Sequence, residues 1–476
     1  MEFKHIRGNC LILFEKVIEI PAIIIGVIFG VFLVKSLDEQ ALIPIAFILL
    51  SPISRLINYF FTYYTLSEDY LIVESGVFTK KKTEIPFSTI TTVDLSQNII
   101  FQLFRVYKIK VDNASQTNEV ANKSNVNLTL KIDEAIRFKQ IITNRLKIET
   151  SNIETAKIET AKKEEIEAMR AQPQDFVKLG LLQSKSVYFL SIIAVVGPLL
   201  GTIAPSFQNV FVGGLIVAAI IIIYLITIAV SVVKCVVTYY NFKVWADDDA
   251  LKVQYGFLNK KSFSLQKSKI NGIILKQSLL MKLCKLYTAE VIVIGYGDSS
   301  KEGGTEQAIL FPIASIERIM QIVNRVLPEY KLDYTLCKPQ RKAIRYFFFS
   351  LGFGFVAVAC LSAIIVAIHL NNYIVLICAI LVLALSIVGV MLKFGNAGIC
   401  VGDKNVVLSA GGFNKMIAIV KTKSIESITS SGSIFKRKRG FVSIKLGFIA
   451  PLRVSNIASL NLPVTQFDLL KGVLKY

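Results

Sequence analysis

The chain has 476 residues, of which 53% are hydrophobic and only 18% are charged, and its mean hydropathy is +0.56. Soluble globular domains carry about 25% charged residues, so this composition excludes an ordinary soluble protein and favours a membrane protein with sizeable polar domains. The net charge of +20 indicates an anionic neighbour. A membrane surface explains this charge with fewer assumptions than a nucleic acid does, because the hydropathy already places the chain in a bilayer.

Six apolar stretches are long enough to cross a bilayer as helices, which takes about 20 residues each. They form three closely spaced pairs, joined by the short connections KSLDEQ, PSFQN and HLNN. Each pair therefore predicts a helical hairpin that enters and leaves the membrane on one side. The stretches cover residues 17–36, 41–61, 187–204, 210–237, 346–368 and 373–392.

The basic residues are distributed unevenly around these stretches. Of the 54 Lys and Arg residues, 49 lie in the three long polar segments, whereas the hairpin tips hold only Lys35. Because positive residues stay on the cytoplasmic side, we expect a multi-pass protein of the cell (inner) membrane, with both termini and all three polar segments cytoplasmic. Arg55 lies inside a predicted span, where it either marks a functional path or, as we favour, snorkels from the end of the span.

One unit of sequence occurs three times, once in each polar segment. GVFTKKKTEIPFSTI begins at Gly76, GFLNKKSFSLQKSKI at Gly256 and GGFNKMIAIVKTKSI at Gly411. Alternating apolar and polar residues flank each glycine, which is typical of two strands joined by a tight turn. Glycine adopts the positive φ that such a turn requires, so we predict structural hairpin turns at these three positions.

The similarity between the copies extends beyond the hairpin. Gln97 and Gln277 each follow their turn glycine by 21 residues. Further strand-like runs come next, and each segment ends with an amphipathic helix, predicted over residues 132–146, 313–327 and 462–476. We expect the apolar residues of these helices to cover the sheets; they include Ile136, Ile319 and Leu469.

An antiparallel sheet closed by a C-terminal helix is the architecture of pleckstrin-homology (PH) domains. Paired apolar stretches that lead into SGVFTKKKTEIPFSTITTVDLSQN or YGFLNKKSFSLQKSKINGIILKQS make the chain resemble the bacterial PH-domain membrane proteins of the YdbS/YdbT-like family. The resemblance covers nearly the whole chain. It implies a multi-pass α-helical membrane protein with three cytoplasmic PH-like β-barrel or sheet domains, each closed by a C-terminal helix, and so an α+β protein overall. The third copy is the most divergent, with Gly432 at the glutamine position.

The predicted organisation alternates membrane hairpins with PH-like domains. A charged segment rich in I-E-T repeats follows the first domain and is interpreted as a linker. In chain order we predict transmembrane hairpin 1 over 17–62, PH-like domain 1 over 63–148, a charged linker over 149–184, transmembrane hairpin 2 over 185–238, PH-like domain 2 over 239–330, transmembrane hairpin 3 over 344–393 and PH-like domain 3 over 394–476.

Patterns that indicate catalysis or metal binding are weak in this sequence. His5 and His369 have no spacing that pairs them with a nucleophile. The glycine-rich run 295–304 lacks the ending of a P-loop, and the seven cysteines form no C-x-x-C pattern. We therefore expect a protein that is not an enzyme, with no catalytic residues, cofactor or metal site.

Clusters of basic residues are the best candidates for recognition. A Lys or Arg near an anionic leaflet contributes about 1 kcal/mol, and a domain held by its own span meets that surface at high effective concentration. The alternative is that the charge only retains these segments in the cytoplasm; we favour it for the first two clusters and weigh it evenly for the third. The candidate anionic-lipid contacts are Lys80, Lys81, Lys82, Lys260, Lys261, Lys436, Arg437, Lys438 and Arg439.

These observations predict a membrane-tethered scaffold or binding protein. Its PH-like domains would contact a protein partner or anionic lipid at the cytoplasmic face, and their open sheet edges favour peptide binding or self-association. No nucleic acid is expected, because no aromatic platform or helix-turn-helix accompanies the charge. The alternative is a subunit of a transport, export or membrane-peptide-defence complex; Gly197-Pro198 and Gly352-Phe353-Gly354 interrupt two predicted spans, as in some transporters.

Overall fold

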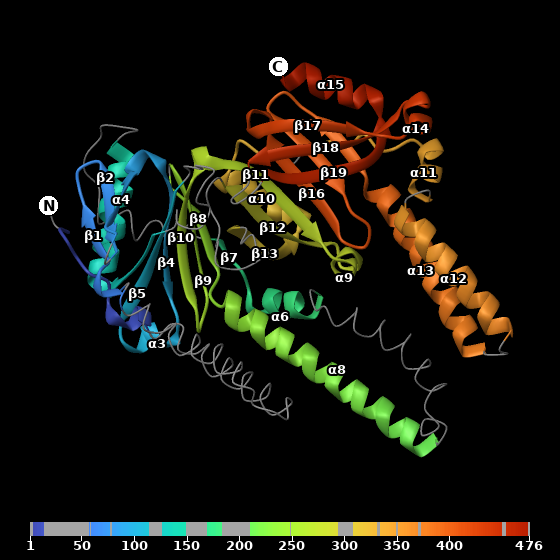
Figure 1. The fold of residues 1–476 in the computed structure, drawn as a ribbon, viewed down its shortest axis with the longest axis horizontal. Helices are drawn as coiled ribbons and strands as arrows, with labels where there is room; N and C mark the ends of the chain where they lie inside the picture. Colours follow the sequence, from blue (N-terminus) through green and yellow to red (C-terminus); the bar gives the residue numbers. More distant parts are fainter. Residues whose placement is uncertain are drawn as a thin grey trace. The chain divides into compact units, whose positions relative to one another are not determined.

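The computed structural model describes residues 3–13, 57, 59–76, 79–113, 126–148, 169–182, 210–247, 249–293, 308–330, 334–348, 351–369, 373–449 and 454–474. In this part of the chain, antiparallel sheets alternate with helices (Figure 1). The chain divides into two compact units. The first comprises Met1–Glu165, Leu258–Gln266 and Gly295–Gly304, and the second comprises Ile166–Phe257, Lys267–Ile294 and Thr305–Tyr476.

The first unit contains the strands of the first sequence repeat, arranged as two antiparallel meanders. Within each meander every strand pairs with the next one along the chain. In the second meander a short helix connects the first strand to the second, and a long helix follows the third strand. The elements are η1 (Cys10–Leu13), β1 (Tyr63–Leu66), β2 (Tyr70–Ser75), β3 (Lys81–Pro86), η3 (Phe87–Thr89), β4 (Ile90–Gln97), α3 (Ile99–Leu103), β5 (Val106–Asn113), β6 (Val126–Lys131) and α4 (Ile132–Ile148).

The second sequence repeat supplies one strand, β10 (Lys260–Gln266), to the first unit, and its other elements lie in the second unit. These follow the order seen in the first repeat. They are β8 (Lys243–Ala246), β9 (Ala250–Tyr255), η5 (Lys267–Lys269), β11 (Ile270–Gln277), α9 (Leu279–Leu283), β12 (Leu286–Val293), β13 (Ala308–Ser315) and α10 (Ile316–Val326). The two-residue strand β7 (Met169–Arg170) precedes this repeat in the chain and pairs with β8.

The third repeat lies entirely in the second unit and has the same element order. It consists of β14 (Gly398–Val401), β15 (Asn405–Ala410), β16 (Lys415–Lys421), η7 (Thr422–Ser424), β17 (Ile425–Ser431), α14 (Ile434–Lys438), β18 (Phe441–Ile449), β19 (Val454–Pro463) and α15 (Val464–Leu474).

Strand pairs between repeats extend the sheets. Within the first unit, β10 of the second repeat pairs antiparallel with β4 of the first. Within the second unit, β16 of the third repeat pairs antiparallel with β11 of the second, which gives a six-stranded sheet in the order β13-β12-β11-β16-β15-β14. The third strand of a repeat therefore joins the fourth strand of the repeat before it.

Turn glycines occupy corresponding positions in the three repeats. Gly76, Gly256 and Gly411 have φ values of +114°, +111° and +109°. A Cβ atom at Gly76 or Gly411 would collide with a backbone carbonyl oxygen, that of Thr79 or Asn414. The turn therefore requires glycine for both its backbone conformation and its space.

Each closing helix packs on its sheet through one row of apolar side chains. On α4 the buried residues are Ala135, Phe138 and Ile142, whereas Ile136 is 41% exposed. The prediction that Ile136 faces the sheet is therefore wrong, because each helical residue is rotated by about 100° from the last and the larger Phe138 sets the buried face. The prediction is also wrong for Leu469, which is exposed beside buried Leu470, and is confirmed for the fully buried Ile319 on α10.

Among the described residues, three long apolar helices accompany the sheets: α8 (Val210–Tyr239), α12 (Leu351–His369) and α13 (Tyr373–Asn396). Helices α12 and α13 pack against each other as a hairpin (Figure 1). Within the described residues, two segments are long and apolar enough to cross a membrane, Ile221–Tyr239 and Val375–Asn396. The predicted spans 17–36 and 187–204, and most of 41–61, lie outside the described residues.

Shorter helices precede the apolar ones in the chain. η6 (Arg341–Ala343) and α11 (Ile344–Phe348) precede α12, so the predicted span 346–368 begins within α11. α6 (Pro173–Leu182) precedes α8 and lies within the segment predicted as a linker. α6 buries Phe176 and Leu179, so this part of the segment is a packed helix; residues 149–168 lie outside the described residues.

Candidate functional site

Each repeat places a short helix between its fourth and fifth strands. The helices α3, α9 and α14 follow a polar N-cap residue, and in the first two the cap side chain accepts a hydrogen bond from the helix backbone. Each helix is followed by a residue with positive φ, which reverses the chain into the next strand. The caps are Asn98, Ser278 and Ser433, and the reversing residues are Arg105, Lys285 and Gly440.

The glutamine shared by the first two repeats holds this helix in place. Gln97 is buried, and its Nε2 donates to the carbonyl oxygens of Val106 at 3.0 Å and Phe101 at 3.3 Å. Gln277 is equally buried and donates to the carbonyl oxygen of Leu286 at 3.1 Å. Both side chains therefore hold in place the first residue of the strand that follows the short helix. Gly432 lacks such a donor in the third repeat.

The outer faces of the short helices expose large apolar side chains. Leu103 is 79% exposed, Leu283 is 77% exposed and Phe435 is 77% exposed. A cluster of this kind at one corresponding point in three repeats indicates a contact surface, because isolated domains seldom leave such groups in water without a partner. We call these residues the apolar tips: Ile99 and Leu103 on α3 with Phe104 directly after it, Leu279 and Leu283 on α9, and Ile434 and Phe435 on α14.

Helix α9 lies at the ends of two apolar helices. Lys282 Nζ donates to Oδ1 of Asn396, the last residue of α13, at 3.1 Å. Met281 belongs to a small core with Leu179 of α6, and Tyr239, the last residue of α8, packs against it. The apolar tip of α9 is thus held at the level where both candidate membrane helices end.

Helix α6 packs tightly on α8. Ser231 Oγ donates to the carbonyl oxygen of Gly180 at 3.2 Å. A Cβ atom at Gly180 would lie 2.5 Å from the Cα of Val232, so only glycine allows this approach.

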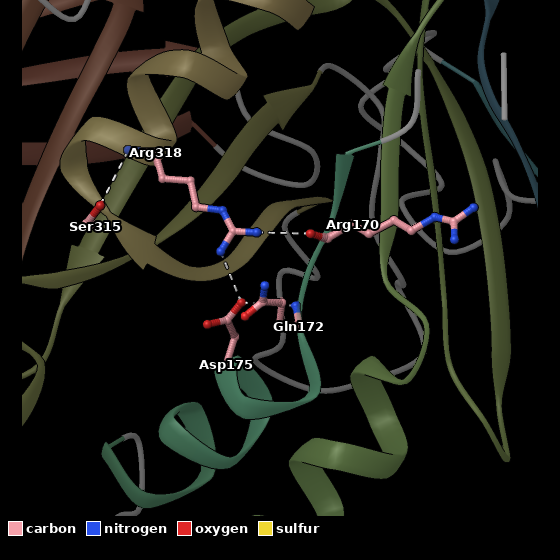
Figure 2. Close-up of polar contacts among 5 residues, drawn as sticks. All are labelled: Arg170, Gln172, Asp175, Ser315 and Arg318. Atoms are coloured by element: carbon pink, nitrogen blue, oxygen red, sulfur yellow. Dashed lines mark hydrogen bonds and ion pairs between the residues drawn. The ribbon is translucent and has the colours of Figure 1, made fainter. Parts of the chain in front are cut away.

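A polar clamp connects α6 to the closing helix of the second repeat, as Figure 2 shows. The guanidinium of Arg318 on α10 contacts Asp175 Oδ2 on α6 at 3.3 Å and the carbonyl oxygen of Arg170 at 3.0 Å. Asp175 Oδ2 also accepts from the backbone N–H of Gln172 at 3.0 Å. The clamp and the α6–α8 contact together fix the second repeat to its apolar helix.

Helix α14 lies beside the entry to the third hairpin. Tyr346 of α11 donates its hydroxyl to the carbonyl oxygen of Phe435 at 3.4 Å and packs against Phe441. Lys436 Nζ lies 5.9 Å from the centre of the Tyr346 ring, and partial burial lowers the pKa of Lys436 below its ordinary value. The neighbouring Arg437, Lys438 and Arg439 are exposed.

The candidate lipid contacts fall into two structural settings. Lys436, Arg437, Lys438 and Arg439 lie on α14 or directly after it, next to an apolar tip. Lys80, Lys81 and Lys82 lie at the start of β3, and Lys260 and Lys261 at the start of β10. Lys82 forms an exposed ion pair with Glu84 at 2.7 Å. The third cluster is therefore continuous in the chain with an apolar tip, and the second lies near the tip of α3, where Gln102 donates to the carbonyl oxygen of Leu258 at 2.7 Å.

The sequence analysis did not single out an acidic pair on neighbouring strands of the first unit. Asp94 on β4 and Asp112 on β5 lie close enough for their charges to interact, and burial together with Asp112 raises the pKa of Asp94 to about 8. Lys110, Lys139 and Lys261 oppose this shift. No group of three or more His, Cys, Asp or Glu side chains that could hold a metal ion occurs among the described residues. Val93 and Leu95 of β4 lie in the core, so strand alternation places Asp94 on the opposite face; the sequence pattern therefore gave no signal for this acidic pair.

The repeated sheets, closing helices and apolar helices define a membrane-associated protein built from PH-like domains. A family model described as "Bacterial PH domain" matches residues 17–175, 191–329 and 348–470, so the chain belongs to the bacterial PH domain family. The chain is similar to UPF0699 transmembrane protein YdbT of Bacillus subtilis (strain 168), with 22% identity over 390 residues, which cover 79% of this chain and 77% of the relative. No solved structure matches the chain.

Proposed function

We propose that this protein is a membrane-tethered, non-enzymatic scaffold whose PH-like domains contact anionic lipid at the cytoplasmic face through their apolar tips. The observation that carries the proposal is the position of α9. Its Lys282 is bonded to the last residue of α13, and its Met281 packs beside the last residue of α8.

The composition of the tips suits the membrane interface. Burying a Leu or Phe side chain contributes about 1.5–3 kcal/mol, and a basic residue near an anionic leaflet about 1 kcal/mol. In α14 the exposed Ile434 and Phe435 are followed directly by four basic residues. Such a segment anchors its apolar side chains among the acyl chains and its charges at the headgroups.

The cytoplasmic orientation is supported by the charge distribution. The three polar segments hold 49 of the 54 basic residues, and basic residues are retained on the cytoplasmic side. A protein of this orientation has its PH-like domains on the side of the leaflet that carries the negative surface potential.

The test uses the full-length protein in nanodiscs that contain anionic phosphatidylglycerol. A fluorophore is attached to Cys284, which is exposed directly after α9, in a variant with the other six cysteines replaced by Ser. Quenching by lipids that carry a nitroxide on the acyl chain measures contact with the bilayer. We expect strong quenching at Cys284.

The matched control places the same fluorophore at Asp403→Cys, in the exposed turn between β14 and β15. β14 starts two residues after α13 ends and runs away from it, so this turn lies at the far end of the strand. Equal quenching at the two positions would overturn the lipid contact and leave a protein partner for the tips. Replacing phosphatidylglycerol by phosphatidylcholine is expected to weaken quenching of a label at Phe435→Cys, because that tip adjoins the basic cluster.

A further inference from the structure

The two junctions between sequence repeats have the same register. Gln97 on β4 lies opposite Lys260 on β10, and Gln277 on β11 lies opposite Lys415 on β16. In both junctions the glutamine follows the turn glycine of its own repeat by 21 residues, and the lysine follows the glycine of the next repeat by four. The correspondence holds at the other end of the ladder, where Thr92 faces Leu265 and Gly272 faces Val420.

Two strands that match these positions remain at the edges of their sheets. β17 is the fourth strand of the third repeat and ends the order β17-β18-β19, and β3 is the third strand of the first repeat and ends the order β1-β2-β3. The residues of β11, which pairs with β16, are almost all buried, whereas Ser427, Thr429 and Ser431 of β17 are exposed. Among the described strands, the first and third repeats therefore each have one strand, β3 or β17, whose edge is unpaired although the corresponding edge is paired at the internal junctions.

We propose that a second copy of this chain pairs its β3 with β17, so that copies assemble head to tail with the register of the internal junctions. In that register Thr83 of one copy lies opposite Thr429 of the other, Lys82 opposite Ser430 and Ile85 opposite Ser427. At the internal junctions, a fourth strand pairs with a third strand. The third strand that lies at a sheet edge is β3, so the partner proposed for β17 is β3 of another copy of this chain.

Features that often protect sheet edges do not exclude this pairing. Lysines and proline at an edge discourage strand addition, and β3 carries Lys81, Lys82 and Pro86. Lys260 and Lys261 occupy the positions of Lys80 and Lys81 in the second repeat, yet β10 pairs with β4. Pro86 corresponds to Gln266, one residue beyond the last pair of that ladder, Leu265 with Thr92.

The membrane makes the head-to-tail geometry feasible. The pairing is heterologous, because β3 and β17 are different surfaces, and heterologous contacts generate rings or filaments. Copies tethered to one bilayer face already share an orientation, and tethering raises their effective concentration. The pairing itself needs no lipid contact by the apolar tips, so the two proposals can fail separately.

Site-directed disulfide crosslinking in native membranes tests the pairing in the full chain. Two differently tagged chains, Thr83→Cys and Thr429→Cys, are co-expressed in a background without native cysteines and oxidised gently. A second combination, Lys82→Cys with Ser430→Cys, covers the neighbouring pair, because adjacent pairs of an antiparallel ladder alternate in spacing and the closer one suits a disulfide. We expect a band at twice the mass of one chain that carries both tags, for at least one combination.

Two controls make the result decisive. Thr83→Cys with Ser427→Cys is shifted by two residues on the same strand and is expected to lose the crosslink. Ser96→Cys with Lys261→Cys in one chain reproduces an internal pair of β4 and β10 and is expected to close within the chain. The proposal is overturned if the internal pair closes while neither intermolecular combination does, or if the shifted pair links as well as the aligned ones. Leu283→Glu, which disrupts a tip, is expected to leave the crosslink unchanged.

Discussion

Lys282 and Asn396 are 114 residues apart in the chain, and their side chains meet through a hydrogen bond of 3.1 Å between Nζ and Oδ1. Asn396 is buried at the end of α13, and its Nδ2 also donates to the carbonyl oxygens of Gly411 and Gly412 at 3.0 and 2.8 Å. One amide therefore ties the last turn of an apolar helix to the turn of one repeat and the short helix of another.

Replacing Asn396 by Ala is expected to free the 411–416 turn, because two backbone carbonyls lose their donor together. An unmade buried hydrogen bond costs about 1–3 kcal/mol. Hydrogen–deuterium exchange in nanodiscs should show faster exchange over residues 411–416. Lys282→Ala removes only the third bond and should leave that segment protected; equal effects of the two variants would contradict the central role of the amide.

Gln277→Ala is expected to loosen α9 and the start of β12. The buried Nε2 of Gln277 donates to the carbonyl oxygen of Leu286, and alanine leaves this acceptor unpaired at a cost of about 1–3 kcal/mol. Amide exchange over residues 279–288 should rise. The third repeat offers a natural comparison, since Gly432 replaces the glutamine. α14 should exchange faster than α9 in the unmodified protein, and the reverse order would count against this role.

Gly180→Ala is expected to separate α6 from α8. The new Cβ would lie 2.5 Å from the backbone of Val232, and overpacking of this kind costs about 1–3 kcal/mol. The melting temperature in detergent should fall. Gly354→Ala in α12 is the matched control, because no atom other than the nearby backbone of its own helix lies within 4 Å of its Cβ position and alanine favours a helix. A similar loss in both variants would show that helix packing at Gly180 is not the cause.

Asp94→Asn is expected to change how the stability of the first unit depends on pH. Burial and the charge of Asp112 raise the pKa of Asp94 from 3.8 to about 8. The folded state therefore holds a proton that the unfolded state loses, and stability declines as the pH rises from about 4 through about 8. The variant carries no such proton, so its melting temperature should match the parent at pH 4 and exceed it at pH 9. A constant difference across this range would contradict the shifted pKa.

Local patterns were enough to predict several parts of this molecule. The turn glycines and the apolar helices follow from φ preferences and from the length of hydrophobic runs, which act within a few residues. The shared glutamine was visible as a fixed spacing, but its hydrogen bond across the short helix was not. The apolar tips were missed because Leu103 and Leu283 look like core residues in a pattern that records hydrophobicity and not exposure.

By itself, the sequence determined the threefold repeat, the turn at Gly76, Gly256 and Gly411, and the helix that ends each repeat, because these depend on residues close together in the chain. Only the tertiary structure decided that β10 joins β4 and β16 joins β11. It also decided that Arg318 meets Asp175 across 143 residues and that Phe138 and not Ile136 faces the sheet. Sheet edges offer the same backbone donors and acceptors whatever their sequence, so their pairing is selected by the shape and tethering of whole repeats.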